Sequence, residues 1–496
     1  MNDFQFQNTT KVYFGKDQLG HLHGEVLKYG KSILVVYGGG SIKKIGLYDK
    51  VIKELKENNI EVYELAGVEP NPRHTTVNKG AKICKDNHIT SILGIGGGST
   101  IDASKAIAAL TLADTDNIWD LVEKKVAWNN ALPVLAMPTI ASTGSEMDKS
   151  CVIANVEKGV KSGINGDILR PKAAFLDPTN TFSVSAKQTA CGGFDIMAHL
   201  FDMNYFVNSD KYPLQFNVVQ TLLRTVREQL PIAIKEPENY AARATMLWAA
   251  SWALNSFCTS GYKTQAQLHA LEQFSSTYDM THGLALAIIT PKWMTYLLNK
   301  DETVVADFAR FGLNVMGIQD QGDDMANAKA GIEALQNFIK DELHLPTTLS
   351  EMNITDEKFD ELKVKACYGQ DSLPRAYRPL SQEDCLNIYK MCFFFLHKRE
   401  YAIINKRGDT MNNVVHFNMI LEINQLLKQN DIEYSIHGVG GCTCCGLELR
   451  QEGKSYPTDK ILEVINGYLK NHWIYVQENK YQSGFLTVHS KFDKNP

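Results

Sequence analysis

Short apolar runs alternate with amphipathic helical stretches over residues 1–182. The run Ser32–Tyr37 is apolar and rich in β-branched residues, as expected of a strand that is buried on both faces of a parallel sheet. Similar runs and intervening helical patterns predict an α/β domain with a mostly parallel sheet. The expected strands are 61–65, 91–95, 132–137 and 173–177, and the expected helices between them are 47–58 and 100–110.

From Ser185 onward the apolar positions recur with a helical period, and strand signals become rare. Pro178, directly after a predicted strand, marks the boundary between the two patterns. These features predict an all-α domain over residues 183–398, with helices at 218–228, 240–254, 304–311 and 325–340.

The last segment, residues 411–496, mixes both patterns behind a charged linker at 397–410. We expect a small α+β module there, without an internal repeat. Its predicted helices are 418–429 and 459–470, and its predicted strands are 432–436, 472–477 and 484–489.

Composition and charge narrow the class of protein. A chain of 496 residues is too long for one ordinary domain. The net charge of −5, without a basic run, makes nucleic acid an unexpected partner. The first residues lack the pattern of a secretory signal, and the longest aromatic apolar run, 391–396, is too short to span a bilayer. Ten cysteines without such a signal favour reduced thiols, so we expect a cytoplasmic protein that does not engage a membrane.

Two glycine-rich loops follow predicted buried strands. Gly39, Gly40 and Ser41 follow one strand, and Gly96–Ser99 follow another and open a helix. Glycine lets the backbone approach a phosphate closely, and a helix N-terminus favours an anion. The alternative is a pair of plain tight turns. Neither loop has the Gly-Lys-Ser/Thr sequence of a Walker A motif.

Asp195 and His199 lie four residues apart in an apolar helical stretch, and His269 and His282 lie in a second apolar region. Residues at i and i+4 project from the same face of a helix. One oxygen and three nitrogen ligands suit Fe(II) or Zn(II). A surface pair or a satisfied core pair is the alternative, but an unpaired charge in apolar surroundings would be costly, which favours a metal site.

Cys442, Cys444 and Cys445, with His437 nearby, offer soft ligands in the C-terminal module. Their spacing is not that of a zinc ribbon, so a loop of buried thiols is the alternative to a zinc site.

Several strings together resemble the iron-containing alcohol dehydrogenase family, and most of all its NADPH-dependent butanol dehydrogenases and aldehyde reductases. The resemblance covers residues 5–393 and rests on VYGGGSIKK, PNPR, GIGGGSTIDASKAIA, PTIASTGSEMD, FLDP, GGFDIMAH and YDMTHGLALAIITPKWM. It implies a dinucleotide-binding α/β domain, a helical domain and a site in the cleft between them. There a metal held by Asp195, His199, His269 and His282 polarises an aldehyde or alcohol oxygen, and a nicotinamide exchanges hydride with the carbon. The family also suggests a homodimer.

The same resemblance implies the cofactor contacts. The Gly96, Gly97, Gly98 and Ser99 loop would hold the pyrophosphate, and Gly39, Gly40 and Ser41 would meet the adenosine ribose. An acidic residue that would hold a ribose 2′-hydroxyl is missing there, and Lys43 and Lys44 lie beside it, so NADP(H) is expected over NAD(H). The other implied contacts are Asn71, Asp102, Thr139, Thr143, Ser145 and Lys161.

The sequence departs from the family pattern at three places. His269 and His282 are thirteen residues apart, one fewer than usual, and Gln273 stands where a histidine is usual. A lost residue rotates the following helix by about 100°, so a bulge must absorb it or the site is distorted. Asp148 replaces an asparagine, and the C-terminal module lies outside the family pattern. Two other functions therefore stay open: a dehydroquinate synthase-like lyase, and a catalytically impaired relative that acts as a binding protein.

Overall fold

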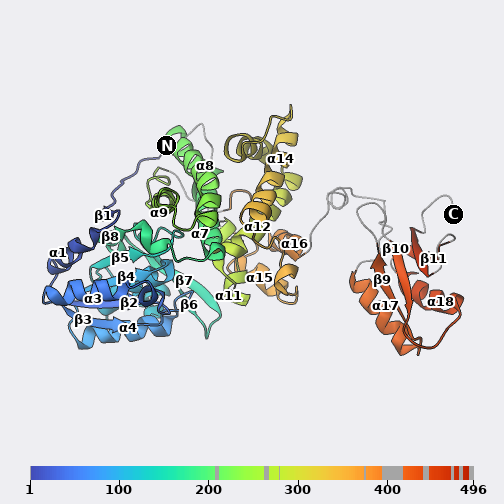
Figure 1. Cartoon of the computed structure of the whole chain (residues 1–496), viewed down its shortest axis with the longest axis horizontal. Coiled ribbons are helices and arrows are strands. Elements are labelled where there is room, and N and C mark those ends of the chain that lie inside the picture. The colour runs from blue at the N-terminus through green and yellow to red at the C-terminus, as the bar shows by residue number, and fades with distance from the viewer. Residues whose placement is uncertain are drawn as a thin grey trace. The chain divides into compact units, whose positions relative to one another are not determined.

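The computed structural model describes residues 2–206, 212–261, 267–278, 280–373, 376–393, 417–439, 446–470, 474–479 and 484–490. It divides into two compact units, Met1–Phe395 and Leu396–Pro496 (Figure 1). The first unit holds the predicted α/β region and the predicted helical region. The two domains of this unit, residues 1–182 and 183–398, remain a proposal. The second unit holds the C-terminal module.

Six parallel strands form the central sheet of the first unit, in the order β1-β8-β5-β4-β2-β3. The predicted parallel sheet is confirmed, with its strands close to the expected positions. The edge strand β1 was not predicted. The strands are β1 (Lys11–Phe14), β2 (Ser32–Tyr37), β3 (Glu61–Leu65), β4 (Ser91–Gly96), β5 (Val134–Pro138) and β8 (Ala173–Leu176).

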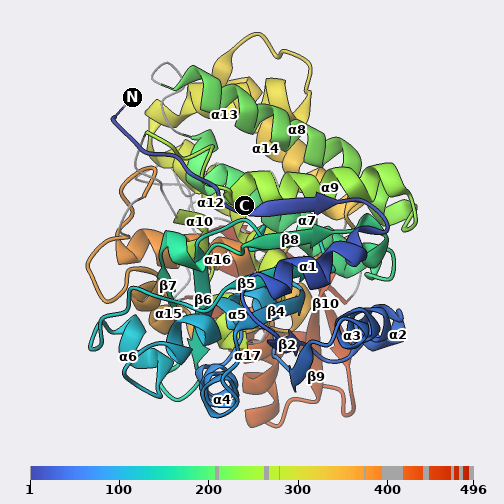
Figure 2. The same cartoon turned by 90° about the vertical axis from the view of Figure 1, so that its left-hand side faces the viewer.

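Helices cover both faces of this sheet (Figure 2). Side chains alternate between the faces along each strand, so Ile33 and Val35 pack on one side while Leu34 and Val36 pack on the other. The first side is covered by α1 (Leu22–Leu27) and α3 (Leu47–Glu57), and the second by α4 (His74–Asp86), α5 (Gly98–Thr111) and α6 (Ile118–Val122).

A β-hairpin and a short helix stand at the carboxyl ends of the strands. The short helix α2 (Ser41–Lys44) follows β2, and β6 (Ser150–Asn155) pairs with β7 (Val160–Asn165) in an antiparallel hairpin. The hairpin was not predicted, and it lies against α5, next to the glycine loop that precedes that helix.

The helical part of the first unit packs around α7, whose residues from Thr189 to Leu200 are all buried. Within the described residues, no helix is both long and apolar enough to cross a membrane. The helices are α7 (Ala186–Leu200), α8 (Pro213–Lys235), α9 (Tyr240–Leu254), α10 (Gln267–Leu271), α11 (Phe274–Tyr278), α12 (His282–Lys300), α13 (Val305–Phe311), α14 (Asp324–Asn337), α15 (Phe359–Ala366) and α16 (Gln382–Phe393).

The second unit consists of two helix–strand–strand halves. The first half is α17 (Phe417–Gln429), β9 (Tyr434–Val439) and β10 (Gly446–Gln451), and the second is α18 (Thr458–Leu469), β11 (Ile474–Glu478) and β12 (Phe485–Ser490). The four strands form one antiparallel sheet in the order β11-β12-β10-β9, so the second strands of the two halves pair at its centre.

The same asparagine contact recurs in both halves. The Asn424 side chain accepts a hydrogen bond from the Ile436 backbone N–H at 2.7 Å and donates one to its carbonyl at 3.0 Å. Asn466 makes the equivalent pair with Val476 at 2.7 and 2.9 Å. The expectation of no internal repeat was therefore wrong. The sequence around the two asparagines repeats as Ile-Asn-x-x-Leu-Lys, at 423–428 and at 465–470, and the strand order and these contacts make the repeat clear.

Candidate metal centre

Asp195 and His199 lie on the most buried helix of the first unit, α7, and both side chains are buried. The helix approaches its neighbours closely through glycine. A Cβ on Gly192 would lie 2.4 Å from the Ala141 carbonyl oxygen, and one on Gly193 would lie 2.3 Å from Leu230. The glycines before Asp195 therefore allow the close packing that buries its carboxylate.

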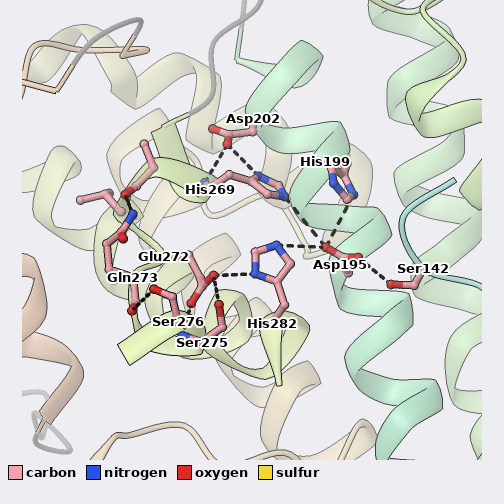
Figure 3. Close-up of polar contacts among 12 residues, drawn as sticks. Ser142, Asp195, His199, Asp202, His269, Glu272, Gln273, Ser275, Ser276 and His282 are labelled. Carbon is pink, nitrogen blue, oxygen red and sulfur yellow. Dashed lines mark hydrogen bonds and ion pairs between the residues drawn. The ribbon is translucent and has the colours of Figure 1, made fainter. Parts of the chain in front are cut away.

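Asp195, His269 and His282 each offer a ligand atom, and these atoms lie within 4.8 Å of one another. The Asp195 Oδ1 atom is 3.9 Å from His269 Nε2 and 3.8 Å from His282 Nε2 (Figure 3). The three side chains come from α7, α10 and the first residue of α12, so packing of three helices brings them together.

Each of the two histidines is held by a second acid. His269 Nδ1 lies 2.9 Å from Asp202 Oδ2, and His282 Nδ1 lies 2.5 Å from Glu272 Oε2. Because these acids accept the Nδ1–H protons, both imidazoles present the lone pair of Nε2 to Asp195. Within the described residues, the buried side-chain atoms without a hydrogen-bond partner include Asp195 Oδ1, His199 Nδ1 and His269 Nε2.

Such a group fits a divalent cation. Buried acceptor atoms that face one another without a shared proton are costly unless a positive charge lies between them. Burial alone would raise the pKa of Asp195, but the neighbouring imidazoles of His199, His282 and His269 and the hydrogen bond from Ser142 hold it below its usual value. Its other oxygen, Oδ2, accepts a hydrogen bond from Ser142 Oγ at 2.6 Å.

His199 lies beside this set without joining it. Its Nδ1 is 3.6 Å from Asp195 Oδ1, and its ring stacks on His269 with 4.4 Å between centroids. Burial lowers the pKa of His199 to about 3, so the imidazole is neutral at pH 7 and able to act as a ligand. Its role as a fourth ligand stays a prediction.

The missing residue between His269 and His282 is absorbed by a break in the helix. Glu272 and Gln273 separate α10 from α11, and both histidines still reach Asp195. The Gln273 amide donates to the Ala270 carbonyl at 2.9 Å, and Figure 3 shows it turned away from His282. The expected distortion of the site is therefore confined to this break.

The glycine loop after β4 lies at the N-terminus of α5, as expected for a phosphate cradle. A Cβ on Gly98 would lie 2.3 Å from Thr143 Oγ1, so the loop permits only glycine there. The backbone N–H of Asn71 donates to Ser99 Oγ at 3.3 Å, and the N–H of Thr139 donates to the Gly96 carbonyl at 3.0 Å. The structure thus gathers these expected cofactor contacts at one edge of the sheet.

Asp102 and Ser145 belong to a buried network next to that loop. The Asp102 carboxylate accepts Ser145 Oγ–H at 2.5 Å and the Val152 N–H at 2.9 Å, and Lys105 donates to Ser145 Oγ at 2.8 Å. Burial raises the pKa of Asp102, against the opposing charge of Lys105. This network joins α5 to the hairpin, so its members shape the loop whether or not they also touch a cofactor.

Asp148 lies just before β6, and Lys161 lies on β7 of the hairpin. The Asp148 carboxylate accepts the N–H groups of Lys149 and Ser150 at 2.6 and 3.1 Å, so it caps the turn that leads into β6. Lys161, on β7, lies close enough to Glu272 to help lower the pKa of that carboxyl.

Gly39, Gly40 and Ser41 form the turn between β2 and α2, where Gly40 has φ of 98°. The Lys43 side chain contacts two aromatic rings. Its ammonium lies 4.4 Å from the Tyr48 ring centroid and 5.1 Å from that of Tyr37, and both tyrosines donate to Glu64 at 2.8 Å. The Lys43 ammonium therefore interacts mainly with the cluster formed by Tyr37, Tyr48 and Glu64.

Cys442, Cys444 and Cys445 lie outside the described residues. Their proposed partner, His437, lies on β9 with Nε2 2.8 Å from Ser435 Oγ. The zinc hypothesis for this loop stays a prediction.

Asp202, Glu272 and Ser142 were not predicted from the sequence. Asp202 follows Asp195 by seven residues, about two helical turns, which places it on the same side of α7 and its continuation. Glu272 follows His269 by three residues, about one helical turn, which is a similar signal. Neither spacing identifies a histidine partner without the fold.

Comparisons with known proteins point to one family. Residues 9–178 match the family described as iron-containing alcohol dehydrogenase, and residues 189–393 match the C-terminal part of the Fe-containing alcohol dehydrogenase family. NADH-dependent butanol dehydrogenase A of Clostridium acetobutylicum is 41% identical over 79% of this chain and 100% of its own length. NADPH-dependent aldehyde reductase YqhD of Escherichia coli is 31% identical over 74% of this chain and 93% of its own length.

Solved structures show the same fold. The crystal structure of NADH-dependent butanol dehydrogenase A from Thermotoga maritima superposes with a TM-score of 0.73 at 32% identity, covering 79% of this chain and 99% of that one. The resemblance inferred from the sequence is therefore confirmed. The chain is an oxidoreductase that belongs to the iron-containing alcohol dehydrogenase family.

Proposed function

We propose that this enzyme interconverts short-chain aldehydes and primary alcohols, such as butanal and butanol, with a nicotinamide cofactor and one divalent metal ion, Fe(II) or Zn(II). The observation that carries the proposal is the convergence of ligand atoms of Asp195, His269 and His282 within 4.8 Å of one another, with Asp195 Oδ1 and His269 Nε2 buried and without a hydrogen-bond partner. A bound ion would supply Lewis-acid polarisation of the substrate oxygen. The names of the related butanol dehydrogenases and aldehyde reductase support this substrate class.

The chain's own residues would prepare the site. Asp195, His269 and His282 hold the ion, with His199 as the proposed fourth ligand. Asp202 and Glu272 keep the two imidazoles in the tautomer that binds a metal. The loop from Gly96 to Ser99 orients the pyrophosphate, so that the nicotinamide would lie between the two halves of the unit.

Replacing His282 tests the site. We expect His282→Ala to lose the ion and to reduce butanal turnover by about 100-fold or more, because one of the few ligands is gone while the helix remains. Metal analysis of the purified protein and the oxidation of reduced cofactor, followed by absorbance, measure both effects. A matched control is His23→Ala, which removes an imidazole on α1 that is bonded to Glu54 on α3. Unchanged metal content and rate in His282→Ala would remove the proposed site.

Cofactor choice is a second, finer proposal. The turn at Gly39–Ser41 carries no acidic side chain that would repel a 2′-phosphate, but Lys43 is occupied by Tyr37, Tyr48 and Glu64. The preference for NADP(H) expected from the sequence would then depend on Lys44. We propose that the enzyme accepts both nucleotides, as the mixture of NADH- and NADPH-dependent relatives also favours.

The Lys44→Ala variant tests this choice. It should lower kcat/KM for NADPH several-fold and leave kcat/KM for NADH unchanged, since only the 2′-phosphate is affected. Lys50→Ala, on exposed α3 surface, is the control. Equal losses with both nucleotides would contradict a 2′-phosphate contact.

The cytoplasmic location and the homodimer expected from the sequence are likewise proposals. Buried thiols at Cys84, Cys151, Cys191, Cys367, Cys385 and Cys392 support a reducing compartment. The relatives described above are dehydrogenases and reductases, which favours hydride transfer over the lyase alternative. The converging ligand atoms argue against the impaired relative.

A further inference from the structure

The segment between the two histidine ligands is built as two short helices with a break between them. Glu272 still donates its N–H to the Leu268 carbonyl at 2.8 Å, but Gln273 donates to Leu271 at 2.9 Å, a tighter turn than an α-helix allows. A new helix, α11, begins at Phe274. The direction of everything after the break, including His282, therefore depends on what holds α11 to α10.

Glu272 bridges that break with three contacts. Its Oε1 accepts the Ser275 N–H at 2.7 Å, and its Oε2 accepts Ser275 Oγ–H at 2.8 Å and His282 Nδ1–H at 2.5 Å. Two of these contacts fix the first turn of α11, and the third fixes a metal ligand on α12. The side chain is 1% exposed, so bulk water does not compete for them.

Asp202 offers a contrast within the same site. Its carboxylate accepts the N–H groups of Leu268 and His269 at 2.8 and 2.9 Å, as well as His269 Nδ1–H. All of these groups lie before the break, on α10. The two acids thus fix different parts of the segment: Asp202 orients the ligand before the break, and Glu272 orients the ligand after it.

We propose that Glu272 is a positioning residue that compensates for the shortened spacing, by locking α11 to α10 and aiming His282 Nε2 at Asp195. This inference rests on the proposed metal site. It assigns to Glu272 a role in joining two helices as well as in orienting one imidazole.

Ser275 and Ser276 provide a matched pair of tests. Ser275→Ala removes a hydroxyl bonded to Glu272, whereas Ser276→Ala removes one bonded to the Gln273 carbonyl at 3.1 Å, outside the bridge (Figure 3). We would measure Zn²⁺ and Co²⁺ dissociation constants of the full chain by competition with a chelator. Amide hydrogen exchange over residues 274–278 would be followed in the same samples.

Glu272→Gln should weaken metal binding by about 10- to 100-fold, the usual effect of losing a ligand's hydrogen-bond partner. It should also speed exchange in α11, because the single amide oxygen of glutamine cannot accept from both the Ser275 N–H and the His282 Nδ1–H. Ser275→Ala should show the same two changes to a smaller degree, and Ser276→Ala neither. Asp202→Asn should weaken metal binding without changing exchange in α11.

Wild-type metal affinity in Glu272→Gln would overturn the positioning role. Weakened affinity with unchanged exchange in α11, in both Glu272→Gln and Ser275→Ala, would overturn the joining role. If the wild-type chain binds neither ion, the proposed metal site fails. The exchange measurement then still decides whether Glu272 joins the helices.

Discussion

Asp102 and Lys105, one turn apart on α5, are charged side chains that the sequence places in an apolar helix. Lys105 is completely buried, and its ammonium reaches Ser145 Oγ and the Ser150 carbonyl. Asp102 bonds the same hydroxyl and so supplies the balancing negative charge. A buried cation of this kind is tolerated only while that network is complete.

Asp102→Asn should lower the free energy of unfolding by about 3 kcal/mol, because it leaves the Lys105 charge buried without its counter-charge. Thermal or urea unfolding would measure the loss. Asp116→Asn is the matched control, since Asp116 is 94% exposed in its pair with Lys85 and should change little. Equal stability of the two variants would show that Asp102 does not balance Lys105.

Among single residues, the proposed metal ligands could be predicted from the sequence, but the acids that hydrogen-bond to the histidines could not. Asp195 and His199 show an i, i+4 spacing, and His269 and His282 lie in recognisable strings. The acids that orient the two histidines, Asp202 and Glu272, resemble ordinary helix acids in sequence, because their partners are set by the packing of other helices.

Helices α7 and α12 approach closely at the metal centre because Gly283 has no side chain. A Cβ on Gly283 would lie 1.9 Å from the Cys191 carbonyl oxygen of α7, closer than any real contact. Gly283 directly follows His282, so this close approach sets how near that imidazole comes to Asp195. Glycine is therefore required at position 283, because α7 and α12 lie too close together for a side chain there.

Gly283→Ala should force the start of α12 away from α7 and weaken metal binding together with stability. Backbone oxygen cannot move as a side chain can, so we expect a loss of about 2 kcal/mol or more. Gly24→Ala, on α1 with open space around it, should be neutral or stabilising by about 0.5 kcal/mol. Metal titration and thermal unfolding would compare the two variants. A Gly283→Ala protein as stable and as well metallated as Gly24→Ala would contradict this packing argument.

Among the elements, the long apolar runs were the most predictable. Strands β2, β4 and β5 are buried on both faces and have continuous apolar sequences. β1 and the hairpin of β6 and β7 escaped prediction because they are partly exposed and lack a continuous apolar sequence. Their pairing depends on neighbours that are distant in sequence.

At the scale of the whole molecule, the first unit is complete without the second. The two family matches together cover residues 9–178 and 189–393, and the relative from Clostridium acetobutylicum aligns over its full length with 79% of this chain. The second unit has its own core of residues such as Ile423, Ile436, Leu447 and Ile465.

Truncation after Phe395 should therefore give a folded enzyme whose kcat/KM for butanal and metal content match those of the full chain. Calorimetry should show one unfolding transition fewer, since each unit has its own core. Loss of activity on truncation, with folding intact, would instead assign the second unit a part in catalysis.

The repeated halves of the second unit meet through β10 and β12, where Leu447 faces Leu486. A single half on its own would leave this inner strand with an unpaired edge, and such an edge pairs readily with another chain. Two separate copies pairing there would build the same four-stranded sheet. The tail thus has the architecture of a homodimer whose subunits have become covalently linked, which frees each half to change its loops independently. The cysteine-bearing connection between β9 and β10 has no cysteine counterpart between β11 and β12.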